Sequence, residues 1–156
     1  MEKTLIILKP DSLQRGLAGR IISRFEDKGF QIVGLKAIQI SRALAEKHYA
    51  VHQGKPFYPR LIEYITSSPV IVMAVQAANG IAVARKMMGA TFGSKAEAGT
   101  IRGDFGLSNS FNLIHGSDSP EAAEAEIALY FKPEELLTYR RDNERWIYDC
   151  TGGQPE

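Results

Sequence analysis

The sequence has very little cysteine, because Cys150 is the only one among 156 residues. A single thiol cannot form an internal disulfide bond, so we expect a reducing compartment and assign the chain to the cytoplasm. The amino-terminal apolar run is too short for a signal peptide, and no segment approaches the length of a membrane span. These absences argue against a secreted or membrane-bound protein.

The chain also lacks an excess of charge of either sign. Lysine and arginine total 19 and aspartate and glutamate total 18, which gives a formal net charge of +1. A protein that holds a nucleic-acid backbone needs a broad basic surface, so we expect no specific nucleic-acid partner and only a local anion site. With 44% hydrophobic residues, one compact domain over residues 1–156 is the simplest organisation.

Two common ligand-binding motifs are missing as well. The chain contains no G-x-x-x-x-G-K-[ST] motif, so the P-loop route to nucleotide phosphates is absent. His48 and His52 lie four residues apart in a predicted helix, yet the H-E-x-x-H pattern is missing and no third metal ligand is evident. We interpret both histidines as solvated or phosphate-facing.

Hydrophobic periodicity predicts strands and helices that follow one another along the chain. Short apolar or β-branched runs indicate strands at Thr4–Leu8, Gln31–Ile40, Pro69–Val75 and Phe111–Ile114. Helical spacing and capping residues indicate helices from Leu17 to the stop at Gly29, Ala43–Val51, Tyr58–Thr66, Gly80–Met88 and from Ser119-Pro120 to Tyr130. The pattern is typical of an α+β or α/β protein, and periodicity alone does not give the strand order.

Two segments between these elements are predicted to be irregular. Lys9-Pro10-Asp11 is interpreted as a turn that closes the first strand. Gly89–Ser110 contains five glycines and little periodicity, so we expect a long loop, and loops of that length usually carry function.

His115 is the first candidate for catalysis. It follows the last predicted strand and precedes a capped helix, and Gly116 behind it permits a sharp turn. Taken alone, such a histidine is more often structural or merely exposed. Its neighbourhood therefore decides between the two interpretations.

Glu126 is the neighbouring residue that favours a catalytic role for His115. The core-facing positions of the helix after Ser119 are Ala122, Ala123, Ile127 and Tyr130, and Glu126 falls on the same stripe. A carboxylate among core positions needs a partner, and His115 is near. A carboxylate that accepts a hydrogen bond from one ring nitrogen leaves the other free to act as a nucleophile. The alternative is a helix one residue out of phase, with Glu126 in solvent.

Three further side chains could bind a phosphorylated ligand. Arg85, near a helix end, and Arg102, in the glycine-rich loop, have the forked guanidinium that fits phosphate oxygens. Phe57 follows the turn residues Lys55-Pro56, where an aromatic ring can offer a stacking face, although pattern alone favours a core position.

Taken together, these segments resemble the nucleoside diphosphate kinase family over Lys3 to Asp149. The stretch Asn112–Asp118 resembles the family's active-site signature N-x-x-H-G-S-D, which is far more specific than any single residue above. Further matches are Lys9-Pro10-Asp11, His48-Tyr49, Lys55-Pro56-Phe57, Gly99–Phe105 and Phe131–Glu135.

The resemblance implies a ferredoxin-like α+β fold, in which helices cover a four-stranded antiparallel sheet and a long glycine-containing loop precedes the last strand. It also implies ping-pong transfer of the γ-phosphate of ATP or another nucleoside triphosphate to a nucleoside diphosphate, through phosphohistidine at His115. Mg²⁺ would arrive with the nucleotide phosphates, without a dedicated protein site.

The same resemblance implies roles for individual residues. Glu126 and Ser117 would orient His115, and Tyr49 would lie beside it. Arg85, Arg102 and Thr91 would bind phosphates, and Lys9 and Asn112 would reach the sugar hydroxyls and terminal phosphates. His52 would contact phosphate, and Phe57 would stack on the base.

The sequence departs from many family members at Phe92-Gly93, Asn109 and Phe111, which bear on the conformation of the loop and on subunit contacts. We expect a homo-oligomer, a hexamer first and a tetramer as the alternative, because the carboxyl-terminal Trp146-Ile147-Tyr148 lies beyond the last clear helix and needs cover. The rival functions are a ferredoxin-like RNA-binding module and a catalytically silent scaffold.

Overall fold

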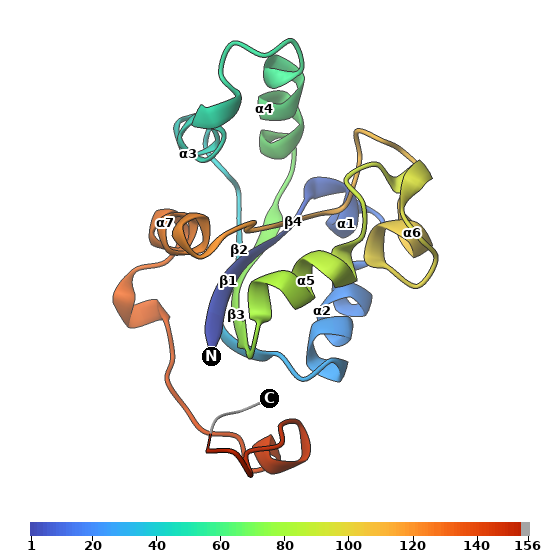
Figure 1. Cartoon of the computed structure of the whole chain (residues 1–156). Coiled ribbons are helices and arrows are strands. Elements are labelled where there is room, and N and C mark those ends of the chain that lie inside the picture. Colours follow the sequence, from blue (N-terminus) through green and yellow to red (C-terminus); the bar gives the residue numbers. More distant parts are fainter. Residues whose placement is uncertain (154–156) are drawn as a thin grey trace.

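The computed structural model describes residues 1–153, which contain one four-stranded antiparallel sheet with helices on both faces (Figure 1). The strands are β1 (Glu2–Leu8), β2 (Gln31–Ile38), β3 (Val70–Ala77) and β4 (Ile114–Gly116). Their order across the sheet is β2-β3-β1-β4, and every neighbouring pair is antiparallel. This is the α+β, ferredoxin-like sheet that the family resemblance implies.

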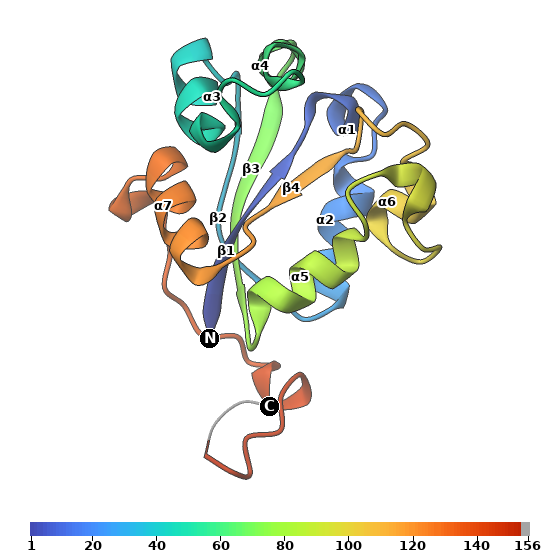
Figure 2. The same ribbon diagram turned by 45° about the horizontal axis from the view of Figure 1, so that its top comes forward.

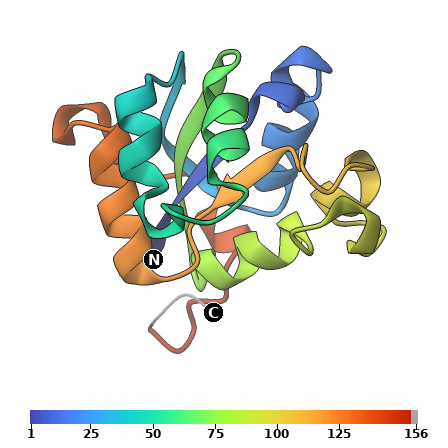
Figure 3. The ribbon, with the colours of Figure 1, turned by 90° about the horizontal axis from the view of Figure 1, so that it is seen from above.

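Helices cover the sheet in two groups. The α-helices are α1 (Pro10–Gln14), α2 (Ala18–Asp27), α3 (Arg42–His48), α4 (Tyr58–Thr66), α5 (Gly80–Met88), α6 (Ile101–Phe105) and α7 (Pro120–Tyr130). Short 3₁₀ helices lie at Ala50–His52, Gly93–Lys95, Pro133–Glu135 and Glu144–Trp146. Figures 2 and 3 show α3, α4 and α7 on one side of the sheet and α2 and α5 on the other. Within residues 1–153, no helix is long and apolar enough to span a bilayer.

Strand β1 is buried on both faces because it lies between these two groups. Leu5 and Ile7 pack into the core under α3, α4 and α7, whereas Ile6 and Leu8 pack into the core under α2 and α5. All four side chains are fully buried. Successive residues of a strand point to opposite faces, so an unbroken apolar run supplies both cores.

Local capping explains why the predicted helices start where they do. Ser41 accepts a hydrogen bond from the Leu44 amide at the start of α3, and Ser119 accepts one from the Ala122 amide at the start of α7. A side-chain acceptor at this position satisfies an amide that the helix itself leaves free. The predicted bounds of α4 and α5 agree with the structure.

Three predicted elements were wrong in detail. The proposed turn at Lys9–Asp11 leads directly into α1, because proline is favourable at the first helical position. The loop 89–110 contains α6, a helix of five residues that is too short to show periodicity. The last strand is β4 rather than Phe111–Ile114, so His115 lies within a strand and not after it.

The backbone of Leu113 explains the shift of the last strand. Leu113 is fully buried and has a φ angle of 70°, which prevents an extended chain at this residue. This left-handed conformation costs a non-glycine residue on the order of 1–2 kcal/mol, so surrounding contacts must hold it. The extended pairing with β1 therefore begins only at Ile114, where it matches Leu8, and places His115 opposite Ile7.

The segment after β1 supplies those contacts. The Leu113 carbonyl accepts hydrogen bonds from the Lys9 amide at 2.8 Å and from the Ser12 hydroxyl at 2.6 Å. The Leu113 amide donates to the Asp11 carboxylate at 3.1 Å, and the same carboxylate accepts a bond from the Tyr64 hydroxyl. We call Lys9, Asp11 and Ser12 the Leu113 clamp.

Asn109 and Gly93, two of the positions where we expect a departure from the family pattern, contact other parts of the loop 89–110. The Ser94 hydroxyl donates to the Asn109 side-chain oxygen at 2.7 Å and so links the two ends of the loop. Gly93 is buried, and a Cβ atom there would lie 2.1 Å from the Gly106 carbonyl oxygen. A side chain at residue 93 would therefore force the loop open.

We predict that Asp11→Ala lowers the free energy of unfolding by about 2–3 kcal/mol, because it leaves the Leu113 amide and the Tyr64 hydroxyl without their acceptor. Urea denaturation followed by circular dichroism measures the effect. Gln14→Ala, in the exposed part of the same short helix, is the control and should change stability by less than about 1 kcal/mol. Equal effects of the two substitutions would show that the clamp does not hold Leu113.

Candidate active site

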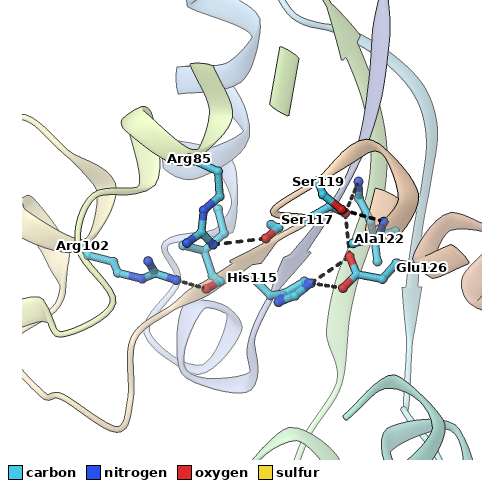
Figure 4. A network of polar contacts seen from close by, with 10 residues as sticks. Arg85, Arg102, His115, Ser117, Ser119, Ala122 and Glu126 are labelled. Atoms are coloured by element: carbon cyan, nitrogen blue, oxygen red, sulfur yellow. Dashed lines mark hydrogen bonds and ion pairs between the residues drawn. The ribbon is translucent and has the colours of Figure 1, made fainter. Parts of the chain in front are cut away.

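Strand β4 presents His115 to a carboxylate on the neighbouring helix α7. The Nε2 atom of His115 lies 3.0 and 3.1 Å from the two carboxylate oxygens of Glu126 (Figure 4). Both side chains are largely buried, with 21% and 17% of their surface exposed. The predicted pairing of Glu126 with His115 is therefore present, and the alternative that placed Glu126 in solvent is wrong.

Ser117 completes this arrangement from the end of β4. Its hydroxyl donates to Glu126 at 2.6 Å and accepts a bond from the Leu5 amide of β1. Burial opposes ionisation of Glu126, but the hydrogen bonds from His115 and Ser117 outweigh it and hold the pKa of this carboxyl below its usual value. Glu126 is therefore an anion that accepts a hydrogen bond from Nε2–H of His115. The ring nitrogen that keeps a free lone pair is Nδ1.

Gly116 serves close packing rather than the sharp turn that we expected. It lies inside β4, and a Cβ atom on it would be 2.6 Å from the Met88 sulfur of α5 and 3.2 Å from Ile6. Only glycine lets α5 approach the strand this closely. The approach brings Arg85, on the same helix, to the strand, where it donates to the Gly116 carbonyl at 3.4 Å (Figure 4).

Lys9 follows the end of β1, the strand that pairs with β4. Its ammonium is buried and donates to the Asn112 side-chain oxygen at 2.7 Å, while the Asn112 amide group donates to the Thr91 carbonyl at 3.0 Å. Burial, together with the positive charge of Arg102, lowers the pKa of Lys9 to about 8. The three predicted residues Lys9, Asn112 and Thr91 therefore form one hydrogen-bonded row.

Arg102 lies in helix α6 and is only 4% exposed, whereas we expected it in an irregular loop. Its guanidinium donates to the backbone carbonyls of Gly89, Asn112 and Ile114 at 2.7–3.1 Å. It therefore joins the loop 89–110 to the strand that contains His115. Burial and the charge of Arg85 lower the pKa of Arg102 to about 10.

Lys9, Arg85 and Arg102 form a local cluster of positive charge. The pKa of Lys9 is lowered in part by Arg102 and that of Arg102 in part by Arg85, so the three side chains repel one another in the ligand-free protein. An anion with several oxygens relieves such repulsion. The cluster therefore has the charge that a local anion site requires, on a chain with almost no net charge.

The connection between α3 and α4 contributes aromatic residues. Tyr49 is buried, with its ring 6.5 Å from that of His115, and burial raises the pKa of its hydroxyl. The His52 ring packs edge to face on Phe57 at 5.4 Å, and Phe57 is 49% exposed. The core position that pattern favoured for Phe57 is therefore wrong, and one face of its ring is available to a ligand.

His48 is the residue that the sequence interpretation missed. We expected it to be solvated or phosphate-facing, but it is 91% buried and its ring lies 4.6 Å from the ring of His115. Burial, helped by the charge of His115, lowers the pKa of His48 to about 3, so the ring is neutral. Its position three residues after the buried Ala45 places it on the inner face of α3, a signal that the spacing already carried.

Comparisons with known proteins agree with this geometry. A family model described as nucleoside diphosphate kinase matches residues 2–136. The nucleoside diphosphate kinase of Carboxydothermus hydrogenoformans is 58% identical over 149 residues, which cover 96% of this chain and 100% of the relative. That of Thermococcus kodakarensis is 58% identical over 151 residues, or 95% of this chain and 86% of the relative.

Solved structures give the same result for the fold. The nucleoside diphosphate kinase of Halobacterium salinarum, solved in complex with CDP, superposes with a TM-score of 0.93 at 46% identity and covers 95% of this chain and 99% of its own. A family member from Babesia bovis superposes with a TM-score of 0.91 at 42% identity over 95% and 100%. By sequence and by structure, the chain belongs to the nucleoside diphosphate kinase family.

Proposed function

We propose that this kinase transfers the γ-phosphate of ATP or another nucleoside triphosphate to a nucleoside diphosphate in two half-reactions, through a phosphohistidine at His115. The observation that carries the proposal is the contact between Nε2 of His115 and Glu126 at 3.0 Å. Family membership gives no support to the RNA-binding or silent-scaffold alternatives. In the mechanism that the family resemblance implies, both half-reactions use the same site.

The nucleophile in this mechanism is Nδ1 of His115. Because Nε2–H donates to the Glu126 carboxylate, the lone pair of Nδ1 is free to attack the γ-phosphorus as the bond to the β-phosphate oxygen breaks. The ring gains positive charge during the attack, and the adjacent anion stabilises it. Ser117 holds the carboxylate in place through its 2.6 Å hydrogen bond, and Tyr49 packs beside the ring.

The positive cluster binds the phosphates. Phosphoryl transfer is accelerated mainly by position and by stabilisation of charge on the transferred oxygens, which fixed cations provide. Arg85 is exposed and near the strand, so we assign it to the transferred phosphate, with the free donors of Arg102 beside it. Lys9, Asn112 and Thr91 then reach the sugar hydroxyls and terminal phosphates.

The exposed ring of Phe57 stacks on the base, and His52 contacts phosphate from the same segment. Stacking uses a π-face that every base has, so the site takes nucleotides of all bases with modest differences. The Halobacterium salinarum relative was solved with CDP, a nucleoside diphosphate, and we transfer this ligand class to the present chain.

Mg²⁺ enters with the nucleotide. Both oxygens of Glu126 already face His115 and Ser117, and the other predicted site residues are cations or neutral donors, so they suit phosphate oxygens rather than Mg²⁺ itself, which favours oxygen ligands. When bound to the phosphates, Mg²⁺ neutralises part of their charge. The residues of this chain hold the nucleotide and orient His115.

We also propose that the enzyme is a cytoplasmic homo-oligomer, a hexamer first and a tetramer as the alternative. Strands β2 and β4 are the sheet edges, and Trp146 is 80% exposed although it is the largest apolar side chain of the tail. Ile147 and Tyr148 are half-buried, because Ile147 packs over Gly29 and the Tyr148 hydroxyl accepts a bond from the Ala78 amide. Of Trp146, Ile147 and Tyr148, Trp146 is therefore the residue that needs cover from another subunit.

Brief incubation with γ-labelled ATP tests the nucleophile. Wild-type enzyme should retain label in an acid-labile, alkali-stable phosphoramidate and release it as GTP when GDP is added. His115→Ala should retain none and lose at least about a thousandfold in turnover, because no other side chain replaces the nucleophile. His52→Ala, the matched histidine control, should still become labelled. Label on His115→Ala would refute the assignment.

We expect kcat/KM for MgATP to fall as pH rises through about 8. The Lys9 ammonium, whose pKa is about 8, is charged below this pH and neutral above it, and only the charged form attracts phosphate. Lys9→Arg keeps its charge throughout the range, so the decline should be absent from its profile even if its rate is lower. An identical descending limb in both enzymes would assign the titration to another group.

Light scattering at micromolar concentration tests the assembly. We expect the mass of a hexamer, and Trp146→Ala should lower the assembled fraction without removing phosphoenzyme formation, because Trp146 makes no part of the proposed active site. This substitution tests assembly more specifically than truncation after Arg145, because the truncation also removes the internal contacts of Ile147 and Tyr148. A monomer mass for the wild type would contradict the proposal.

A further inference from the structure

His48 is buried against the proposed nucleophile, yet it has no polar contact of its own. It ends helix α3, is 91% buried, and neither ring nitrogen has a hydrogen-bond partner among residues 1–153. Buried polar groups are normally paired, because an unpaired one loses its hydration without compensation. An imidazole in this state requires an explanation beyond packing.

Two tyrosine rings and the ring of the proposed nucleophile surround His48. Its ring meets those of Tyr49 and Tyr130 edge to face, at 4.4 and 5.5 Å, and that of His115 at 4.6 Å. One nitrogen of His48, one nitrogen of His115 and one carboxylate oxygen of Glu126 lie within 4.8 Å of one another. Three donors from α3, β4 and α7 therefore converge on one point.

Two imidazoles and a carboxylate are a ligand set that zinc prefers. Zinc bonds are about 2.0–2.2 Å long, so donors of a tetrahedral site lie roughly 3.3–3.5 Å apart, with the fourth position open to water. His115 and Glu126 lie slightly closer than this, at 3.0 Å, so they must separate by a few tenths of an ångström. His48, whose donor atom lies within 4.8 Å of the other two, needs a shift of up to about 1.5 Å to join them. Mg²⁺ favours oxygen ligands and has little affinity for such a set.

We propose that Zn²⁺, or a similar imidazole-binding cation such as Co²⁺, binds His48, His115 and Glu126 in the nucleotide-free enzyme and blocks phosphorylation. The claim that the cation blocks phosphorylation rests on the proposed function of His115, whereas the claim that the cation binds does not. A neutral imidazole has one lone pair. Whichever nitrogen of His115 binds the cation, that pair forms the metal bond, the other nitrogen keeps its proton, and no pair remains to attack phosphorus.

Direct binding is measured with Co²⁺ and Zn²⁺ on the full chain in a Cys150→Ser background, which removes the exposed thiol as a competing ligand. We expect one cation per chain and visible absorption bands of a four- or five-coordinate Co²⁺ site. His48→Phe keeps a planar ring but has no lone pair, so it should weaken binding at least about tenfold and abolish the bands. His52→Gln, the histidine control outside the cluster, should change affinity less than twofold.

A melting curve for His48→Phe shows whether the variant is folded, and His48→Gln replaces it if it is not. Unchanged affinity in the folded His48 variant, or no Co²⁺ bands in the control background, would overturn the site. Mg²⁺ should neither bind there nor displace Co²⁺.

The claim that the cation blocks phosphorylation is tested by phosphoenzyme formation. Enzyme loaded with Zn²⁺ and freed of excess metal receives a short pulse of labelled MgATP, with the metal-free enzyme as reference. We expect at least about tenfold less label in the loaded enzyme of the Cys150→Ser background. Binding that requires His48 but leaves labelling unchanged would overturn the inhibition. Failure of the proposed function is distinguishable, because it appears as label on metal-free His115→Ala.

Discussion

The left-handed backbone of Leu113 is the constraint on which the rest of the site depends. Held at a φ angle of 70° by the Leu113 clamp, it ends the loop 89–110 and starts β4 in one register against β1. In a strand the side chains alternate between faces, so a slip of one residue would turn His115 to the other face. The side chain of Leu113 is fully buried as well, which makes this strained conformation part of the core. Backbone strain of this kind persists only where the surrounding contacts hold it. Here it determines the face of the sheet to which the His115 side chain points.

The charged groups of the site are held in states that a ligand improves. Glu126 has partners for its charge, because two hydrogen bonds compensate its burial. The hydrogen bonds of Lys9 and Arg102 do not offset burial and mutual repulsion, which lower the pKa values of both cations. A bound phosphate would reduce this repulsion, and donors that the protein already holds in place are the preorganisation that phosphoryl transfer requires. Arg102 also joins three backbone carbonyls, so the same side chain shapes the loop and contributes to the positive field.

The two helical layers contribute differently to the chemistry. Helix α7 brings Glu126 to one side of His115, and α5 and α6 bring the arginines to the other (Figure 4). Helix α3, on the same face of the sheet as α7, brings the ring of His48 to 4.6 Å from that of His115. The residues proposed to activate the nucleophile and those proposed to bind phosphate thus come from different helices around one short strand. Strand β4 lies at the edge of the four-stranded sheet formed by residues 1–153.

The sequence alone determined the features that depend on neighbours within a few turns of chain. Ser119 and Pro120 fix the start of α7, and the helical stripe then puts Glu126 on the inner face, so this pairing with His115 was predictable. The signature around His115 likewise lies in one contiguous segment. Tertiary structure decided the shift of the last strand, the burial of Arg102 and the contact of His48 with the nucleophile. The reason is distance along the chain. Leu113 is held by a carboxylate 102 residues away, and no local sequence pattern predicts a contact that forms only when the sheet assembles.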